Sequence, residues 1–305
     1  MGRLFCLLSA AAFGVMAVFG KLAYDAGVSV DALLLVRFGL AGGLLLFVAL
    51  ARGSLRNLPP RAVLTGLGMG VFGYAAQSAL YFSALARMDA SLVALILYLY
   101  PILVMVAAIA LRRERASRRR VSALAIALIG IGLVLSGALS GRFDGVGVLL
   151  ALGAPVVYTG YILVGDSLTA DVPPLALTAL VCTGAFGTFL VLGFFRGIDL
   201  GFAPVGWLWL AAVALISTVA AILLFFAGMA RVGPSIASIL SIFEPVVTVT
   251  AAALVFGEKL SATQWVGGAL VLSAVLIVQW QTQPSRQSLP ELSRTSPEAT
   301  ADLTV

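Results

Sequence analysis

A chain of 305 residues, 61% hydrophobic and only 10% charged, carries more apolar surface than a soluble domain needs, whereas a lipid bilayer demands that composition. The net charge of +6 comes from basic residues crowded into short loops, which indicates membrane orientation rather than a nucleic-acid-binding face. The chain contains no histidine, which excludes imidazole metal sites, Ser-His triads and histidine proton relays. We therefore expect an integral membrane protein that uses no cofactor and binds no nucleic acid.

Ten apolar runs follow one another along the chain, each near the ~20 residues that a membrane-spanning helix needs. In order, they cover residues 4–20, 30–50, 62–85, 90–111, 119–138, 145–164, 174–194, 205–229, 234–256 and 261–280. The first run follows Arg3 and could pass for a signal peptide. Because it reaches Gly20 and many similar runs follow, we interpret it as a retained span.

Basic residues are distributed unevenly between alternate loops of the first half. Ten would be cytoplasmic if the N-terminus is inside, and three would lie on the other side. The ten are Arg3, Arg52, Arg56, Arg61, Arg112, Arg113, Arg115, Arg118, Arg119 and Arg120, and the three are Lys21, Arg87 and Arg142. This imbalance predicts that both termini are cytoplasmic in a multi-pass protein of the cell (inner) membrane. The tail, residues 281–305, lacks apolar periodicity and is predicted to be disordered and cytoplasmic.

One sequence motif occurs twice, 144 residues apart: YFSALAR at residues 81–87 and FFAGMAR at residues 225–231. The same offset pairs Ser91 with Ser235, Pro101 with Pro245, Glu114 with Glu258, and Ser117 with Ser261. An odd number of spans separates the copies, so the two units are inserted in opposite orientations. We predict an all-α integral membrane fold of ten transmembrane helices in two inverted five-helix repeats, residues 1–140 and 144–280. Such repeats are the architecture of alternating-access carriers.

Two charged residues lie inside predicted spans, where a charge costs about 2.5–3.5 kcal/mol on insertion scales. Glu244 lies in the middle of the ninth span, either as a packing contact or as a proton or substrate site. Low dielectric disfavours the charged carboxylate, so Glu244 is a candidate to load and release a proton. Arg37, in the second span, either snorkels or pairs internally, or it holds an anionic group of a substrate. In a third alternative, Arg37 and Glu244 pair in one conformation and separate in another.

Polar residues of the third span fall on one helical face, because Tyr74, Gln77, Ser78 and Tyr81 are spaced i, i+3, i+4, i+7. This stripe fits a polar cavity wall, or alternatively hydrogen bonds between helices. Tyr158 and Tyr161 form a weaker pair of the same kind. Tyr98 and Tyr100 are two residues apart, so we expect that they do not both face one cavity; Tyr100 corresponds to Glu244 by the repeat offset and is kept as a candidate.

Pro101 and Pro245 are predicted to be mid-helix prolines at equivalent repeat positions, each kinking its helix. Such kinks either improve packing only or provide each half with a hinge beside a central site.

Two other patterns are better explained by packing than by chemistry. Residues 68–73 read G-x-G-x-x-G inside an apolar span, without the strand and the acidic residue that a dinucleotide site needs, so close helix packing explains them better. Cys6 and Cys182 lie in apolar runs and are expected to be small buried residues rather than redox groups.

Several segments resemble the drug/metabolite transporter superfamily, and specifically its EamA family. They are Arg37-Phe38, Ala86-Arg87, Pro101, Leu111-Arg112-Arg113-Glu114-Arg115, Ala230-Arg231, Phe243-Glu244-Pro245-Val246 and Phe256-Gly257-Glu258-Lys259-Leu260-Ser261. The resemblance covers residues 1–280 and implies an inner-membrane carrier of small polar metabolites, often an exporter of amino acids or related compounds, using the proton gradient. One departure is Arg113 before Glu114, where such proteins often carry the glycine that Gly257 supplies before Glu258.

The leading hypothesis is therefore a secondary carrier, not an enzyme, that exports a small polar metabolite with protons as the coupling ion. An uptake carrier or facilitator of the same fold stays open, and an integral-membrane enzyme is a distant alternative. Stripes of small residues pack either within one chain or between two copies, so a homodimer also stays open.

Overall fold

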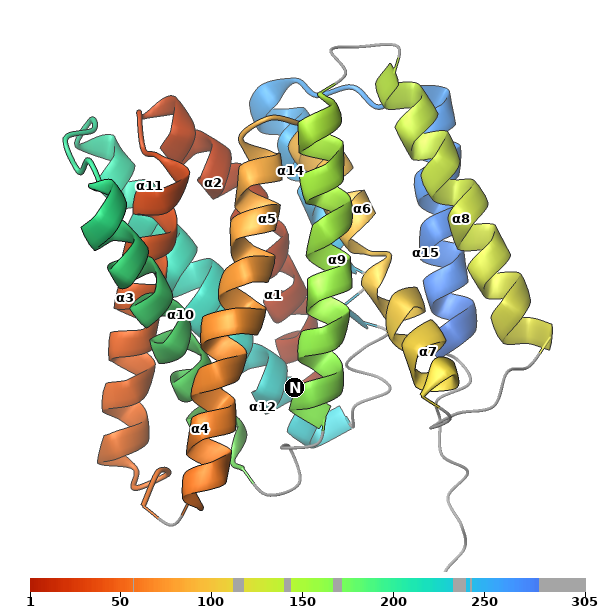
Figure 1. Cartoon of the computed structure of the whole chain (residues 1–305). Helices are drawn as coiled ribbons and strands as arrows, with labels where there is room; N and C mark the ends of the chain where they lie inside the picture. The colour runs from red at the N-terminus through yellow and green to blue at the C-terminus, as the bar shows by residue number, and fades with distance from the viewer. Residues whose placement is uncertain are drawn as a thin grey trace, which may run out of the picture.

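The computed structural model describes residues 1–56, 58–111, 118–139, 144–166, 172–232, 240–241 and 243–279. Within these ranges the chain forms helices, turns and loops and no strand (Figure 1). The predicted tail lies outside them, as do Glu114, Ser117 and Ser235 of the repeat pairs and most of the basic cluster at residues 112–120.

The first half of the chain forms an antiparallel series of helices (Figure 1). Its elements are α1 (Gly2–Gly14), α2 (Met16–Asp25), α3 (Val30–Ala51), α4 (Pro60–Gly68), η1 (Met69–Tyr74), α5 (Ala75–Leu85), α6 (Ala90–Leu97), α7 (Tyr100–Ala110) and α8 (Arg118–Leu139). Here η1 is a six-residue π-helical segment that continues directly from α4 into α5.

The second half is likewise a series of helices. Its elements are α9 (Gly145–Asp166), α10 (Pro174–Arg196), α11 (Val205–Ala214), η2 (Leu215–Ala220), α12 (Ala221–Val232), α14 (Phe243–Phe256) and α15 (Ala262–Gln279). A second π-helical segment, η2, interrupts the helix made of α11 and α12, as η1 interrupts the helix made of α4 and α5. π-Segments inside helices are rare and concentrate at functional sites. Both interruptions therefore indicate a candidate functional site in the middle of the bundle.

Helices from the two halves pack against each other rather than forming separate bundles. α3 packs on α10, α8 on α15, and α6 on α14. α1 and α2 contact α12 and α11, while α5 and η1 contact α9. The α8–α15 pair stands to one side of the bundle in Figure 1, whereas α1, α5, α9 and α12 lie at its centre.

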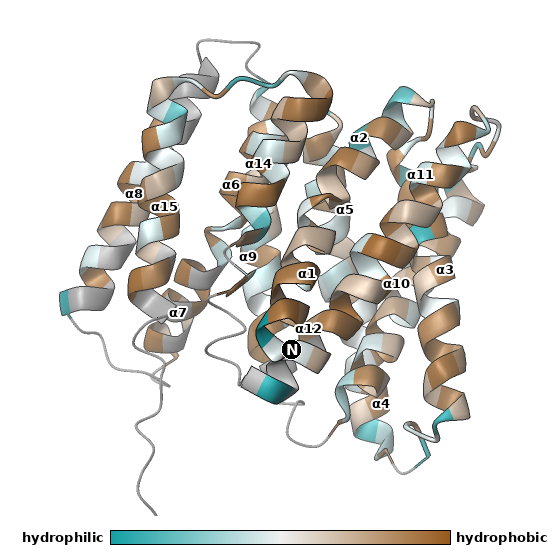
Figure 2. Ribbon diagram, turned by 180° about the vertical axis from the view of Figure 1, so that it is seen from behind, coloured by the Kyte–Doolittle hydropathy of each residue, from teal (hydrophilic) through white to brown (hydrophobic). Residues whose placement is uncertain are grey.

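The outer faces of the helices are apolar along most of their length (Figure 2). Large hydrophobic side chains such as Phe72, Phe194 and Leu254 are about four-fifths exposed. A soluble protein rarely leaves contiguous apolar patches of this kind in water. Lipid is the solvent that suits this surface.

Six helical stretches of the described chain are long and apolar enough to cross a membrane. They are Gly2–Asp25, Val30–Ala51, Pro60–Leu85, Gly145–Val164, Pro174–Arg196 and Val205–Phe225. Two apolar stretches are shorter, Ala90–Val104 and Phe243–Phe256. The protein is therefore an all-α, multi-pass membrane protein. The first stretch runs to Asp25, five residues beyond the predicted end at Gly20.

Glycines allow the closest approach of two helices in this fold. A Cβ on Gly70, in η1, would collide with the Val181 carbonyl oxygen of α10, and one on Gly184 would collide with the Leu67 carbonyl oxygen. Gly68 and Gly43 have open space where a Cβ would stand. The G-x-G-x-x-G run thus contributes to helix packing through Gly70 and through Gly73, whose Cβ would lie 3.2 Å from Tyr161.

Candidate functional site

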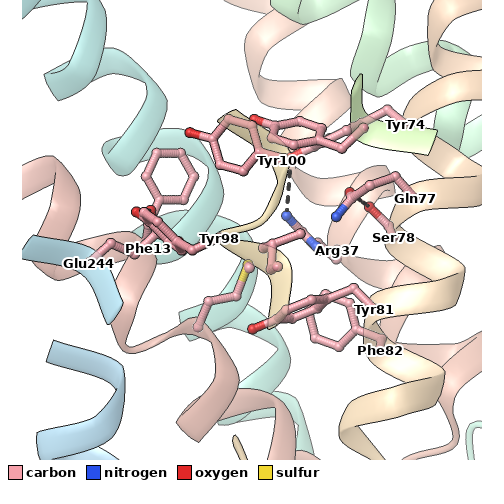
Figure 3. A pocket seen from close by; sticks show the side chains of 13 residues that line it. Phe13, Arg37, Tyr74, Gln77, Ser78, Tyr81, Phe82, Tyr98, Tyr100 and Glu244 are labelled. Atoms are coloured by element: carbon pink, nitrogen blue, oxygen red, sulfur yellow. Dashed lines mark hydrogen bonds between the residues drawn. The ribbon is translucent and has the colours of Figure 1, made fainter. Parts of the chain in front are cut away.

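Two adjoining cavities lie at the centre of the bundle, with volumes of about 90 and about 290 Å³. Residues from α1, η1, α7, α9 and α14 line both: Phe13, Tyr74, Tyr100, Tyr158 and Glu244. The smaller cavity is also lined by Arg37, Gln77, Ser78, Tyr81 and Tyr98 (Figure 3), and the larger one by Tyr161 and Cys182. Every binding residue predicted from the sequence therefore lines one of these cavities.

Arg37 is 2% exposed and is held by neutral groups. Its Nε donates to the Thr218 hydroxyl at 3.0 Å, and its Nη2 donates to the Tyr74 hydroxyl at 3.4 Å. The guanidinium also lies over the rings of Phe38 and Phe82, at 5.0 and 5.2 Å from their centroids. Stacking on aromatic rings replaces part of the hydration that a buried cation loses.

The two hydrogen-bond partners of Arg37 are related by the sequence repeat. Tyr74 lies in η1 and Thr218 in η2, and they are 144 residues apart, the offset of the duplicated motif. The two π-helical segments therefore hold one arginine between them. Sequence reasoning missed Thr218, although the repeat offset applied to Tyr74 leads directly to it.

Glu244 stands in the first turn of α14 and is partly exposed, facing the cavity. Its Oε2 lies 3.1 Å from the Tyr98 hydroxyl. Among the described residues no ion pair joins Glu244 to Arg37 or to any other cation. In this conformation the two opposite charges share one cavity without pairing, and whether they pair in another conformation stays a hypothesis.

Tyr98 corrects a prediction from the sequence. Both Tyr98 and Tyr100 line the smaller cavity, although a spacing of two residues on one helix would separate them by roughly 200°. The reason is a break in the helix: α6 ends at Leu97 and α7 begins at Tyr100. Figure 3 shows Tyr98 beside Glu244 and Phe13, with Tyr100 above it.

The polar stripe of the third span faces the smaller cavity as a group. Tyr74, Gln77, Ser78 and Tyr81 all line it, and the Ser78 hydroxyl donates to the Gln77 side-chain oxygen at 3.4 Å. Gln77 is 7% exposed and Tyr81 4%, so their polar atoms are enclosed by protein.

Tyrosine rings form a continuous wall around the larger cavity. Tyr158 packs edge-on against Tyr100 at 4.8 Å and stacks on Tyr161 at 5.7 Å. Tyr161 stacks in turn on Tyr74 at 5.5 Å. Such a wall offers both aromatic faces and hydroxyl groups to a bound molecule.

Pro101 is not mid-helix, which corrects the prediction from the sequence: it lies in the first turn of α7. The amide of a first-turn residue has no partner within the helix, so proline costs little there and marks the start of a helix. Pro245 is the third residue of α14, but Leu240 and Ser241 are also helical and residue 242 lies outside the described residues, so its mid-helix position stays a prediction. Whether the two prolines act as hinges also stays a prediction.

Neither cysteine is paired, and both are buried. In the described part of the chain, no three His, Cys, Asp or Glu side chains come together as ligands of a metal ion would.

Known proteins resemble this chain along most of its length. The model of the EamA-like transporter family matches residues 1–136 and 145–280. An uncharacterized transporter of Archaeoglobus fulgidus is 29% identical over 279 residues, covering 90% of this chain and 95% of the relative. Among Bacillus subtilis proteins, the uncharacterized transporter YcbK is 26% identical over 87% of this chain and 88% of its own length. The uncharacterized transporter YwfM is 31% identical over 57% of this chain and 58% of its own length.

A solved crystal structure aligns with this one at a TM-score of 0.64 and 21% identity, covering 90% of this chain and 95% of the other. At that identity the likeness concerns the fold alone. The family match and the named relatives make the protein a membrane transporter, and the chain belongs to the EamA-like transporter family of the drug/metabolite transporter superfamily.

Proposed function

We propose that this protein is a secondary active transporter that moves a small polar metabolite, an amino acid or a related compound, by alternating access. The observation that carries the proposal is Glu244: a carboxylate without a cationic partner among the described residues, at the centre of the bundle, in a cavity shared with Arg37. The negative side chain of Glu244 and the positive side chain of Arg37 in one cavity match the two charges of a zwitterion. The tyrosine wall supplies surface for the rest of the molecule.

The mechanism rests on ten spans arranged as two inverted five-helix repeats. The packing supports this arrangement, because several contacts between helices have a counterpart in the other half. α5 contacts α9 as α1 contacts α12, and α10 contacts η1 as α3 contacts η2. Equivalent helices of the two halves also meet each other, as α3 with α10 and α8 with α15. In a pseudo-twofold arrangement of this kind, equivalent helix contacts allow the central cavity to open toward one side of the membrane or toward the other.

Protons are the proposed coupling ion and Glu244 the proposed carrier. A carboxylate with no cation beside it is costly to keep ionised away from water, so it favours binding either a proton or the ammonium group of a substrate. Competition between the two would couple uptake of a proton on one face to release of the substrate. Export then follows from the inward direction of the proton gradient.

The proposed location is the cell (inner) membrane, with both termini in the cytoplasm and lipid on the outer helix faces. In Figure 1 the α3–α4 connection, which carries Arg52 and Arg56, lies at the lower end of the bundle. We assign this end to the cytoplasm because basic loops are retained there. A homodimer stays a proposal that size measurement in lipid nanodiscs would decide.

The test is transport by purified protein in liposomes. A pH gradient is imposed, and uptake of a panel of labelled amino acids and related metabolites is measured for the wild type, Glu244→Gln and Tyr24→Phe. We expect uphill transport by the wild type and by Tyr24→Phe, because Tyr24 lines neither of the two central cavities. Glu244→Gln is expected to lose the pH dependence. An unchanged pH–rate profile in Glu244→Gln would reject its role as proton carrier.

The direction of transport needs a cellular measurement. Cells that lack the transporter are exposed to increasing concentrations of each transported compound or of a dipeptide that releases it inside. Loss of an exporter poisons the cell from within, whereas loss of an uptake carrier starves it when the compound is the sole source. Starvation without poisoning would overturn the proposed export.

A further inference from the structure

The Tyr98 hydroxyl lies within hydrogen-bonding distance of two acceptors at once. Its oxygen is 2.6 Å from the Ser241 carbonyl oxygen and 3.1 Å from Glu244 Oε2. A phenol carries a single proton and can donate one full hydrogen bond. Tyr98 is 3% exposed, while Ser241 and Glu244 are each partly exposed.

The protonation state of Glu244 determines how this shortage is resolved. When Glu244 is ionised, its carboxylate and the Ser241 carbonyl compete for the one Tyr98 proton. When Glu244 is protonated, its own O–H can donate to the Tyr98 oxygen, and Tyr98 can then donate to Ser241. Both contacts are made in the protonated state, whereas in the ionised state the charged carboxylate is the stronger acceptor and draws the Tyr98 proton away from Ser241.

The hydroxyl stands at a break between two helices and contacts a helical residue of another segment. Tyr98 lies between α6, which ends at Leu97, and α7, which begins at Tyr100. Ser241 is itself helical and stands two residues before α14. Chain at a break is not held in a continuous helical ladder and can move with less loss of backbone hydrogen bonding than helix interiors can. The hydroxyl therefore links the α6–α7 break, which is able to shift, to Ser241.

We propose that Tyr98 is a positioning residue that transmits the protonation state of Glu244 to the contact between the α6–α7 break and Ser241. This inference rests on the proposed proton coupling at Glu244. With Glu244 protonated, Tyr98 holds Ser241 and the α6–α7 break stays joined to it. With Glu244 ionised, Tyr98 turns its proton toward the carboxylate and the hold on Ser241 weakens. Only hydrogen bonds change partners, and the proton on Glu244 comes from water.

Other ionisable groups face the same cavity and belong to the design of the test. They are Arg37 from α3, Tyr74 from η1, Tyr81 from α5, Tyr100 from α7 and Tyr158 from α9. From α1 and α2, which pack on α14, the cavity is lined by the apolar Phe13 and Met16. Among these lining groups Glu244 is the one carboxylic acid, so its proton is the one that the experiment follows.

The first measurement reads the hydrogen bond directly, without substrate. Infrared difference spectra of the protein in lipid are recorded across pH, and the carboxyl band of protonated Glu244 is assigned by its loss in Glu244→Gln. We expect Tyr98→Phe to shift this band and Tyr24→Phe to leave it unmoved, since Tyr24 makes a comparable hydroxyl–carbonyl bond to Phe82 at 2.9 Å. An unmoved band in Tyr98→Phe would overturn the proposal.

The second measurement separates positioning from substrate binding. Liposomes carry the wild type, Tyr98→Phe or Tyr24→Phe, and both substrate exchange at equal pH and uphill transport driven by a pH gradient are measured. Tyr98→Phe is expected to lower the gradient-driven accumulation at least tenfold more than it lowers exchange at equal pH. Equal loss of both activities would indicate a substrate contact and count against the proposal.

A wild type that moves no compound of the panel would reject the proposed function, while the infrared measurement would still decide the Tyr98–Glu244 contact. If Tyr98→Phe does not fold, p-aminophenylalanine at position 98 replaces it. The amino group offers two N–H donors, so both acceptors are served at once. We expect that variant to fold, to exchange substrate and to lose the pH dependence; a normal pH dependence would contradict the competition for one proton.

Discussion

The ammonium of Lys21 lies 3.1 Å from the carboxylate of Glu258, joining two residues 237 positions apart in the chain. The same carboxylate accepts hydrogen bonds from the Ala90 amide at 3.0 Å, the Ser91 amide at 3.1 Å and the Ser91 hydroxyl at 2.8 Å. Glu258 therefore caps the first turn of α6, where Asp89, the N-cap residue, makes no side-chain cap bond. One side chain holds together α2, α6 and the α14–α15 connection.

Glu258→Gln is expected to lower the thermal stability of the protein at pH 7. Burial raises the pKa of Glu258, but the hydrogen bonds from Ser91 and Ala90 and the charge of Lys21 outweigh burial and hold the pKa below its usual range. Because its pKa is lowered in the folded state, ionised Glu258 stabilises the fold at pH values above the unfolded-state pKa of about 4.3. This stabilisation is lost as the pH falls through the folded-state pKa. The Tm difference between wild type and variant is therefore expected to shrink below about pH 4.

We expect the loss at pH 7 to be about 1–3 kcal/mol, the usual cost of leaving buried partners of a charged hydrogen bond unsatisfied. Asp31→Asn is the control, because Asp31 forms only a long, exposed pair with Arg196 at 3.8 Å and should change little. Tm values measured in nanodiscs from pH 3 to pH 8 decide the matter. Equal stability of Glu258→Gln and wild type at pH 7 would show that the carboxylate does not hold this end of the bundle.

Gly70→Ala is expected to impair folding, while Gly68→Ala is expected to be tolerated. A Cβ on Gly70 would meet the backbone of α10, at 2.9 Å from the Ala185 nitrogen and 3.0 Å from the Gly184 Cα, and backbone cannot rotate away. Overpacking of this kind costs about 1–3 kcal/mol or more. Gly68 has open space, and alanine is the better helix former there. Yield and monodispersity on size-exclusion chromatography compare the two; similar behaviour would contradict the close packing of η1 on α10.

Thr218→Val is expected to destabilise the protein by about 1.5–3 kcal/mol, because it removes an acceptor from the buried Arg37 guanidinium. Valine has nearly the same shape as threonine, so the loss reports the hydroxyl. Thr250→Val is the matched control: the Thr250 hydroxyl donates to a carbonyl one turn earlier and is exposed. Thermal unfolding followed by fluorescence in detergent would reveal the difference, and equal Tm values for the two variants would argue that the Tyr74 hydroxyl and the aromatic rings hold Arg37 without Thr218.

Tyr158→Leu is expected to raise the KM for a transported substrate about three- to tenfold, the range that aromatic contacts of 0.5–1.5 kcal/mol would produce. Tyr158 contacts both Tyr100 and Tyr161, so its loss opens the middle of the tyrosine wall. Tyr158→Phe keeps the ring and is expected to stay within about twofold of the wild type. Initial rates in liposomes at varied substrate concentration provide the KM of each variant. A KM for Tyr158→Leu equal to that of the wild type would show that the tyrosine wall is not part of the substrate-binding site.

Composition and hydropathy determined the class of this protein because membrane spans obey a simple rule of length and polarity. A run of about 20 apolar residues is a property of adjacent residues and needs no knowledge of the fold. The same applies to the polar face of the third span, where Tyr74, Gln77 and Tyr81 follow ordinary helical spacing and line one cavity. A charge inside an apolar run was also enough to select Arg37 and Glu244, and both line the central cavity.

The tertiary structure alone decided how the centre is connected. Tyr98 reaches Glu244 because the helix breaks between Leu97 and Tyr100, and a periodicity argument assumes that no such break exists. Arg37 meets Thr218 across 181 positions, and Lys21 meets Glu258 across 237. Contacts between residues so far apart depend on how whole helices pack, a sum of many weak interactions that no single stretch of sequence contains. For that reason the sequence could indicate individual residues of the cavity, but not which distant residues they contact.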